Sequence, residues 1–258
     1  MRDILERLVK GEISLDEAEK LLRLNAIEEV GRIAKIDISR EERKEVPEII
    51  LAEGKSVNDT LRIAEAFVEK KGRAIISRVD DKLFRIVKRR FRNGFNVTLN
   101  RDARVIIIKK EGYKVRETGG RVGIIAAGTA DIPVAEEARI MAEEMGCEVI
   151  TEYDVGVAGI HRLFPALKNM AEKDVDVIIV VAGREGALPS VVSSMVNVPV
   201  IAVPRSVGYG FGGHGIGALI AMLQSCSLGL AVVNIDGGTP AGIIAALISN
   251  RVAKWRNR

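Results

Sequence analysis

Covalent chemistry in this chain would most readily come from a thiol at a predicted helix-to-strand junction. Cys226 is one of two cysteines and lies between polar residues in the segment Ala221-Met-Leu-Gln-Ser-Cys226-Ser-Leu-Gly-Leu-Ala-Val-Val-Asn-Ile-Asp236. A thiolate in such a place can act as a covalent catalyst, although a free cysteine is more often a small buried hydrophobe. Cys147, at the opening of a predicted strand, keeps the second interpretation. Cys226 is therefore a candidate nucleophile.

Polar residues and glycines follow each of five predicted strands. After the first strand, Gly128, Thr129 and Asp131 either bind an anion on backbone amides or cap the next helix. After the third, Arg184 and Glu185 stand among Gly, Ala and Leu, where burial would raise the pKa of Glu185 toward acid–base usefulness. The other strand ends supply candidate ligand-binding residues: Asp154, Gly156 and His161 after the second strand, Ser206, Gly208, Tyr209 and Gly210 after the fourth, and Asn234 and Asp236 after the fifth. A lone histidine such as His161 is more often structural than catalytic.

These strands belong to a carboxyl-terminal region of regular alternation. Apolar runs at 121–126, 147–153, 175–181, 198–203 and 230–235 are separated by helical segments. This order predicts an α/β fold with a doubly wound, flavodoxin-like parallel sheet covered on both faces. Ligands of such sheets bind beyond the carboxyl ends of the strands. The five strand ends together therefore predict a phosphorylated, nucleotide-like ligand and at least one acid–base carboxylate, while the missing Walker and Rossmann glycine motifs weigh against a kinase or a dehydrogenase.

The amino-terminal part has a different pattern. Residues 1–30 form a predicted helical hairpin, with two short helices within residues 1–28 and a capping box formed by Ser14 and Glu17. Residues 31–117 form a small α+β domain, and the α/β domain spans 118–258. In the α+β domain we expect strands at 33–38, 48–51 and 73–77, helices at 56–71 and 80–90, and a strand pair within 96–110.

Composition excludes several classes of protein. The chain has 258 residues, 47% of them hydrophobic, and a net charge of +4, so it can bury a core and has no extreme charge. Its basic clusters at 88–92 and 251–258 are typical of solvated faces, and we expect no nucleic-acid partner. The apolar run at 216–235 is interrupted by polar residues, so no membrane span is expected. The sequence shows no export signal and no disulfide framework, which predicts a cytoplasmic protein, and its composition favours a thermophilic source.

Longer motifs resemble a known family. Gly128-Thr-Ala-Asp131-Ile-Pro133, Ala182-Gly183 and Leu188-Pro189 are similar to the aminoimidazole ribonucleotide carboxylase fold family. Further motifs resemble the LarB family, the carboxylases and hydrolases that begin synthesis of the nickel-pincer nucleotide cofactor: Tyr153-Asp-Val-Gly-Val-Ala-Gly-Ile-His161, Gly186-Ala-Leu-Pro-Ser190, Ser206-Val-Gly-Tyr-Gly210, Met222-Leu-Gln-Ser-Cys226, Val233-Asn-Ile-Asp236 and, near the amino terminus, Ile36-Asp-Ile-Ser-Arg40, Pro47-Glu-Ile-Ile50 and Gly54-Lys55.

The resemblance implies that nicotinic acid adenine dinucleotide is carboxylated at pyridinium C5 and that its phosphoanhydride is hydrolysed. The products would be pyridinium-3,5-biscarboxylic acid mononucleotide and AMP. Cys226 would add to ring carbon C4 or C6 and so make C5 nucleophilic, and Glu185 would remove the C5 proton. The remaining roles are implied for two groups: phosphate or ribose binding by Asp131, Thr129 and Ser206, and phosphate or carboxylate binding by Arg40, Arg43 and Lys55.

The same resemblance bears on cofactors and assembly. No tightly bound cofactor is expected, CO2 or bicarbonate is the co-substrate, and magnesium is a candidate for assisting pyrophosphate cleavage. A helix that runs back from the fourth strand end would leave Cys226 about 15 to 20 Å from the strand-end loops of its own chain. Since the related carboxylases build sites between subunits of an octamer, we expect a homo-oligomer, an octamer, in which Cys226 meets a neighbour's Asp131 and Glu185.

Two departures and two alternatives stay open. Asp236-Gly-Gly238 replaces the family's Asp-Asn-Gly, and His214 stands where a small uncharged residue is expected. One alternative is an aminoimidazole ribonucleotide carboxylase or mutase of purine biosynthesis. Its catalytic histidine would follow the Ala-Gly of the third strand end, where this chain has Arg184-Glu185-Gly186. The other is a nonenzymatic nucleotide sensor, which would bind a ligand tightly without turnover.

Overall fold

The computed structural model describes residues 2–24, 27–30, 34–37, 40–208 and 210–256. The chain forms two compact units, one of residues 1–99 and 105–113 and the other of residues 100–104 and 114–258. Each unit has its own sheet and its own apolar core.

The second unit is built on a five-stranded parallel sheet, as predicted. Its strands lie in the order β11-β10-β9-β7-β8. The first two strands of this unit, β7 and β8, therefore lie at one side of the sheet, and the order in which strands are added reverses between β7 and β9. The central strands are buried on both faces, because all six residues of β9 and all five of β10 are shielded from water, whereas the edge strands β8 and β11 are partly exposed. Their bounds are β7 Arg121–Ala126, β8 Glu148–Glu152, β9 Val177–Ala182, β10 Val200–Pro204 and β11 Leu230–Val232.

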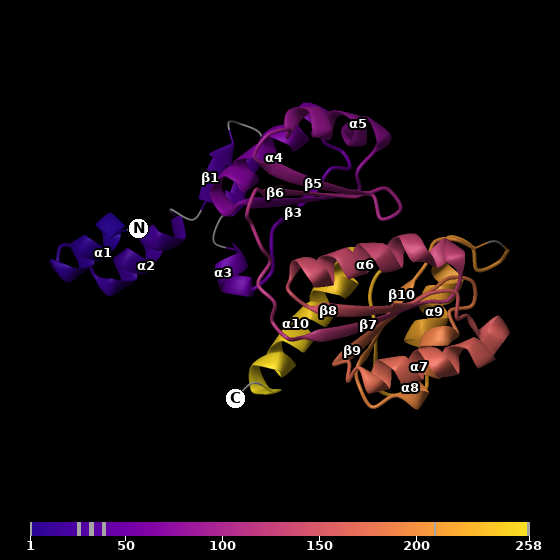
Figure 1. Cartoon of the computed structure of the whole chain (residues 1–258). Coiled ribbons are helices and arrows are strands. Elements are labelled where there is room, and N and C mark those ends of the chain that lie inside the picture. The colour runs from indigo at the N-terminus through magenta and orange to yellow at the C-terminus, as the bar shows by residue number, and fades with distance from the viewer. Residues whose placement is uncertain (1, 25–26, 31–33, 38–39, 209, 257–258) are drawn as a thin grey trace. The chain divides into compact units, whose positions relative to one another are not determined.

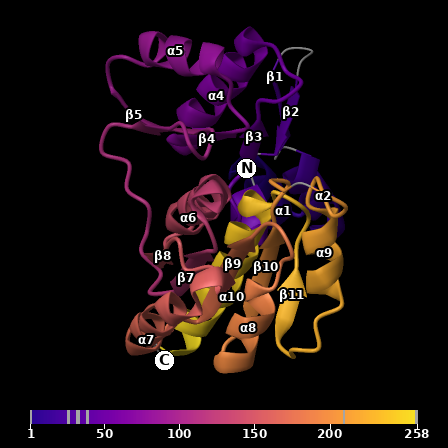
Figure 2. The same cartoon turned by 90° about the vertical axis from the view of Figure 1, so that its right-hand side faces the viewer.

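Helices cover both faces of this sheet (Figure 1). On one face α6 (Ile132–Glu144) packs against α10 (Gly238–Arg256). On the other, α7 (Leu163–Glu172), α8 (Leu188–Met195) and α9 (Ile216–Leu223) share one apolar core with the strands. Figure 2 shows α9 beside β11, at the sheet edge. Two short 3-10 helices, Thr129–Asp131 and Val157–Arg162, follow β7 and β8 and form part of the carboxyl edge.

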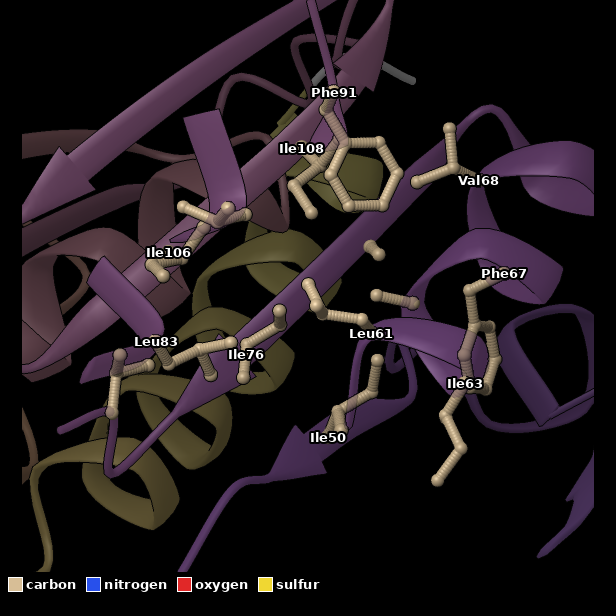
Figure 3. Packing of buried hydrophobic residues seen from close by; sticks show 14 of the residues in the cluster. Ile50, Leu61, Ile63, Phe67, Val68, Ile76, Leu83, Phe91, Ile106 and Ile108 are labelled. Carbon is tan, nitrogen blue, oxygen red and sulfur yellow. The ribbon is translucent and has the colours of Figure 1, made fainter. Parts of the chain in front are cut away.

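The first unit has a four-stranded sheet in the order β3-β4-β6-β5, in which β3 and β4 are parallel and β4 and β6 antiparallel. Buried residues of α4, α5 and the sheet form its core (Figure 3). Ser56 and Asp80 cap α4 and α5 by accepting a backbone N–H three residues on. The elements are α1 Arg2–Val9, α2 Leu15–Leu24, β1 Ile27–Val30, β2 Ala34–Asp37, α3 Arg40–Lys44, β3 Ile49–Leu51, α4 Val57–Lys71, β4 Arg73–Ser77, α5 Asp81–Arg90, β5 Phe95–Asn100 and β6 Val105–Lys110.

The amino-terminal hairpin differs from the sequence prediction at its end. The capping box is present, since Glu17 N–H donates to Ser14 Oγ at 3.1 Å and Ser14 N–H donates to Glu17 Oε2 at 3.3 Å. However, α2 ends at Leu24 rather than near residue 28, and Ile27–Val30 pairs antiparallel with Ala34–Asp37. Strand pairing satisfies backbone groups that a frayed helix end would leave open, so tertiary context outweighs the helical propensity of these residues.

Among the residues described, no helix is both long enough and apolar enough to cross a bilayer.

The close packing of α10 against α6 depends on the absence of a side chain at Gly242. A Cβ at Gly242 would lie 2.4 Å from the Ala138 carbonyl oxygen, although the helical backbone itself would accept alanine. We expect Gly242→Ala to lower the free energy of unfolding by about 1–3 kcal/mol, because the helices must separate. Thermal unfolding measures this. Arg251→Ala, at an exposed position of the same helix, is the control and should change stability by less than about 0.5 kcal/mol. An unchanged melting temperature for Gly242→Ala would contradict the close crossing.

Candidate functional site

A cavity lies at the carboxyl edge of the parallel sheet, at the reversal point between β7 and β9. Its volume is about 740 Å³, and the loops after β7, β8, β9 and β10 line it. Reversal points of this kind are where open α/β sheets bind ligands. Seven residues predicted from the sequence contribute to the lining: Gly128, Thr129, Asp131, Gly156, Arg184, Glu185 and Gly208.

Other predicted residues lie at the same edge without lining the cavity. Asp154 and His161 are exposed after β8, and Asn234 is exposed after β11. Ser206 donates its backbone N–H to Asp236 Oδ1 at 3.0 Å, which joins the loops after β10 and β11. Gly210 has a φ of 82° and follows Tyr209, which lies outside the described residues.

The predicted basic residues Arg40, Arg43 and Lys55 lie in the first unit. Arg40 donates to Glu48 at 2.6 Å, and Lys55 Nζ donates to the Leu51 carbonyl at 2.8 Å. Arg43 is exposed on α3. Their role in ligand binding stays a prediction.

Four strand-end loops hold a non-glycine residue in the left-handed backbone region. The φ angles are 59° for Asp154, 53° for Arg184, 58° for His214 and 54° for Asp236. Such conformations cost free energy and gather at functional sites, where the surrounding structure holds them. Elsewhere in the described part of the chain lie four further such residues, Glu45, Arg78, Arg104 and Asp174, so these angles do not by themselves single out this edge as a binding site.

Asp131 is the most enclosed carboxylate of the cavity, with 6% of its surface exposed. Its Oδ2 accepts the Gly128 N–H at 2.9 Å, and the Gly183 N–H also donates to it. Burial raises the pKa of Asp131 above its usual value, against the lowering effects of these amides and of the Arg205 charge. The carboxylate thus caps the short 3-10 helix before α6, gives α6 itself no side-chain cap, and lines the cavity, while anion binding at this turn stays a prediction.

Sequence reasoning missed Arg205, which comes directly after β10 and links three loops. Its Nη1 donates to Asp236 Oδ1, its Nη2 donates to the Ala130 carbonyl at 3.0 Å, and its Nε lies 3.8 Å from Asp131 Oδ1. Burial acts to raise the pKa of Asp236, but hydrogen bonds from Ser206 and the Arg205 charge hold it below its usual value. The sequence feature that could have identified Arg205 is its place immediately after an apolar strand, where the guanidinium must either be buried or reach across the carboxyl edge of the sheet.

The expectation that Glu185 is buried is wrong for the single chain. Glu185 is exposed, although it lines the cavity. The left-handed Arg184 and the positive φ of Gly186, 63°, turn the chain outward at the tip of the loop before α8 begins. Neighbouring small residues therefore do not enclose the carboxylate, because the turn geometry decides where its side chain lies.

Cys226 lies outside the cavity and is exposed, in the segment between α9 and β11. Its two neighbours are both held by Ser190 of α8. Ser190 Oγ donates to Ser225 Oγ at 2.8 Å, and Ser227 Oγ donates to the Ser190 carbonyl at 2.8 Å. The backbone around Cys226 is thus fixed against α8 while the thiol remains accessible. Cys147, in contrast, is buried, and burial raises the pKa of its thiol to about 12.

Comparison with known proteins was made by family models and by sequence. The model described as AIR carboxylase matches residues 121–255, and the one described as LarB/PurE-like N-terminal domain matches residues 27–110. The chain belongs to the AIR carboxylase family and carries a LarB/PurE-like N-terminal domain. The first model covers the whole parallel sheet with its carboxyl-edge loops, and the second covers the small mixed sheet.

Individual relatives agree with this family assignment. An uncharacterized protein of Methanocaldococcus jannaschii is 49% identical over 256 residues, 98% of each chain. The N5-carboxyaminoimidazole ribonucleotide mutase of Thermotoga maritima is 34% identical over 133 residues, which is 50% of this chain and 74% of that protein. The mutase of M. jannaschii is 34% identical over 137 residues, 51% of this chain and 82% of the mutase. The family therefore indicates an enzyme of the carboxylase or mutase type.

The contrast between the two thiols can be tested directly. In the native AIR carboxylase family member we expect iodoacetamide to modify one cysteine, Cys226, because Cys147 is buried with a raised thiol pKa. Peptide mass spectrometry locates the label. Cys226→Ala should take up no label until denaturant is added, and Cys147→Ala should label as the unchanged protein does. Labelling of Cys147 before Cys226 in the native protein would contradict the described burial.

Proposed function

We propose that this protein carboxylates the pyridinium ring of nicotinic acid adenine dinucleotide at C5 and hydrolyses its phosphoanhydride. The products are pyridinium-3,5-biscarboxylic acid mononucleotide and AMP, the first intermediate of nickel-pincer nucleotide synthesis and its by-product. The observation that carries the proposal is the loop after β9, where Glu185 lines the cavity and the described lining contains no histidine. The cavity volume of about 740 Å³ also lies within the range of small-molecule sites.

The chemistry requires a nucleophile and a base. A cationic pyridinium cannot attack CO2, but a Cys226 thiolate that adds at C4 or C6 breaks the aromaticity and makes C5 an enamine-like nucleophile. The new C5–carbon bond forms to CO2, Glu185 takes the C5 proton, and loss of the sulfur restores the ring. Asp131, Thr129 and Ser206 are assigned to phosphate or ribose, and Arg184 supplies a cation at the cavity.

Magnesium is kept as an aid to cleavage of the phosphoanhydride, carried by the substrate phosphates. Within the residues that the structure describes, no group of three or more His, Cys, Asp or Glu side chains could hold a metal ion, so no residue is assigned to it. No tightly bound cofactor is part of the proposed reaction, and CO2 or bicarbonate is the second substrate.

The reaction also requires a second subunit. Cys226 does not line the cavity of its own chain. The outer face of α9 leaves Ile216, Ile220 and Leu223 each at least half exposed, and Leu228, two residues after Cys226, is 92% exposed. A contiguous apolar face of this kind is typical of an interface. We infer that a neighbouring copy covers it in a homo-oligomer, an octamer, and that Cys226 there enters the neighbour's cavity and shields Glu185 from water.

The reaction is tested by incubating the protein with nicotinic acid adenine dinucleotide, bicarbonate and magnesium. Mass spectrometry should detect AMP and the doubly carboxylated mononucleotide. Cys226→Ser should reduce carboxylation to below about one thousandth, because the hydroxyl is a far weaker nucleophile. Cys147→Ser is the matched control and should retain carboxylation.

Two results would replace this proposal with an alternative. Carboxylation of aminoimidazole ribonucleotide, with no product from the dinucleotide, would assign the activity named for the mutases to this chain. Tight dinucleotide binding without turnover would indicate a nonenzymatic sensor. Full carboxylation by Cys226→Ser would exclude the covalent step.

The shared site is tested by mixing two inactive variants. Cys226→Ser and Glu185→Gln should each be inactive alone, but subunits mixed by co-expression should regain about a quarter of the activity, since that share of random sites combines an intact thiol with an intact carboxylate from different chains. Size-exclusion chromatography with light scattering confirms that the subunits have mixed. If mixed oligomers form but regain no activity, the Cys226 thiol and the Glu185 carboxylate of one site belong to the same chain.

A further inference from the structure

Arg205 is a buried cation directly behind the ligand cavity. It is 9% exposed, and it does not line the cavity itself. Its backbone N–H donates to the Ala182 carbonyl at 3.1 Å, which fixes its Cα at the carboxyl edge of the sheet. The guanidinium then reaches the Asp236 carboxylate and the Ala130 carbonyl. Its Nε has no hydrogen-bond partner and lies 3.8 Å from Asp131 Oδ1.

The path of this side chain across the sheet is unusual. Arg205 follows β10 and Asp131 follows β7, and β9 lies between these strands. The residue after β9 is Gly183, where a Cβ would lie 2.8 Å from the Val207 carbonyl oxygen, 3.4 Å from Arg205 Cβ and 3.5 Å from Asp131 Oδ1. A side chain at Gly183 would thus clash with the Val207 carbonyl oxygen, while its Cβ would only touch Arg205 and Asp131, whose side chains approach each other across a whole strand.

The cluster holds two carboxylates and one cation in a poorly hydrated place. Asp131 and Asp236 face the guanidinium from the loops after β7 and β11, and the charge of Asp236 acts to raise the pKa of Asp131. The other charged groups of the cavity are Arg184 and Glu185 on the loop after β9. Removal of the guanidinium would leave two close carboxylates without the cation that contacts both, and one of them would then favour its protonated form.

We propose that Arg205 is the positioning residue that keeps Asp131 ionised and aimed into the cavity. Arg205 does not line the cavity and acts through Asp131, whose carboxylate accepts the Gly128 and Gly183 amides and lies 3.8 Å from the guanidinium Nε. An ionised carboxylate accepts hydrogen bonds only, so the cavity presents an acceptor to the hydroxyl donors of a ligand at this point. This inference rests on the proposed function in one respect, that the cavity binds a nucleotide.

The test is an infrared titration of the protonated carboxyl group of Asp131, identified by subtracting the spectrum of Asp131→Asn. In Arg205→Gln the band should persist to a higher pH than in the unchanged protein, since loss of the cation raises the pKa of Asp131. In Asp236→Asn the band should vanish at a lower pH, since a neighbouring negative charge has been removed. Shifts of opposite sign distinguish an electrostatic role from general damage, which would move both variants alike. Arg121→Gln, at the opposite sheet edge and paired with Asp174, is the control and should leave the band unchanged.

Activity gives a second readout. With nicotinic acid adenine dinucleotide and bicarbonate, Arg205→Gln should lose at least about tenfold in kcat/KM in mildly acidic buffer and recover most of it in alkaline buffer, and Arg205→Lys should lie between. An unshifted band in Arg205→Gln overturns the inference, as does a downward shift. If Arg205→Gln fails to fold, an unshifted or upward-shifted band in Asp236→Asn overturns it. Opposite band shifts without any turnover would uphold Arg205 and reject the proposed reaction, so the two failures are distinguishable.

Discussion

The contact of one buried guanidinium with two carboxylates is the constraint on which the carboxyl edge of this sheet depends. Arg205 reaches the loops after β7 and β11 from its own position after β10. The helices that follow those loops, α6 and α10, also pack against each other, but Arg205 is the side chain that contacts a carboxylate of each loop. A buried charge is tolerated only when it is paired, so the fold must bring Asp131 and Asp236 to Arg205. The cavity floor is therefore set by charge pairing as well as by packing.

Strand order explains why this pairing takes place. The sheet reverses between β7 and β9, which opens the edge and leaves room for a ligand between their loops. Gly183 permits a close approach of the Val207 carbonyl oxygen, and Gly156 permits one of the Ala127 carbonyl oxygen, since a Cβ at either glycine would lie 2.8 Å from that oxygen. The glycines of these loops thus allow neighbouring backbone segments to pack closely. The left-handed Asp154, Arg184 and Asp236 add backbone strain at the same edge, and the buried sheet beneath supports it.

The sequence could predict what depends on local pattern. Apolar runs separated by helices located all five strands of the parallel sheet, and the rule of strand ends located Asp131, Arg184 and Glu185 on one cavity. The role of Arg205 was not predicted because its partners follow from strand order. That order brings Asp236, 31 positions later in the chain, and Asp131, 74 positions earlier, beside it. The exposure of Glu185 was not predicted because it depends on the left-handed backbone conformations of the residues on either side, Arg184 and Gly186. The small strand at Ile27–Val30 escaped because its pairing outweighs its helical propensity.

Cys226 connects the single chain to the proposed assembly. Ser190 holds the residues on either side of it, so the thiol has a defined place that nevertheless lies outside its own cavity. The most direct measurement is the mass of the Cys226 peptide after the protein is mixed with nicotinic acid adenine dinucleotide without bicarbonate and the adduct is trapped by reduction. Covalent addition to the pyridinium ring predicts a ligand-derived mass on that peptide. Ligand bound at the cavity while the Cys226 peptide keeps its unmodified mass would contradict it.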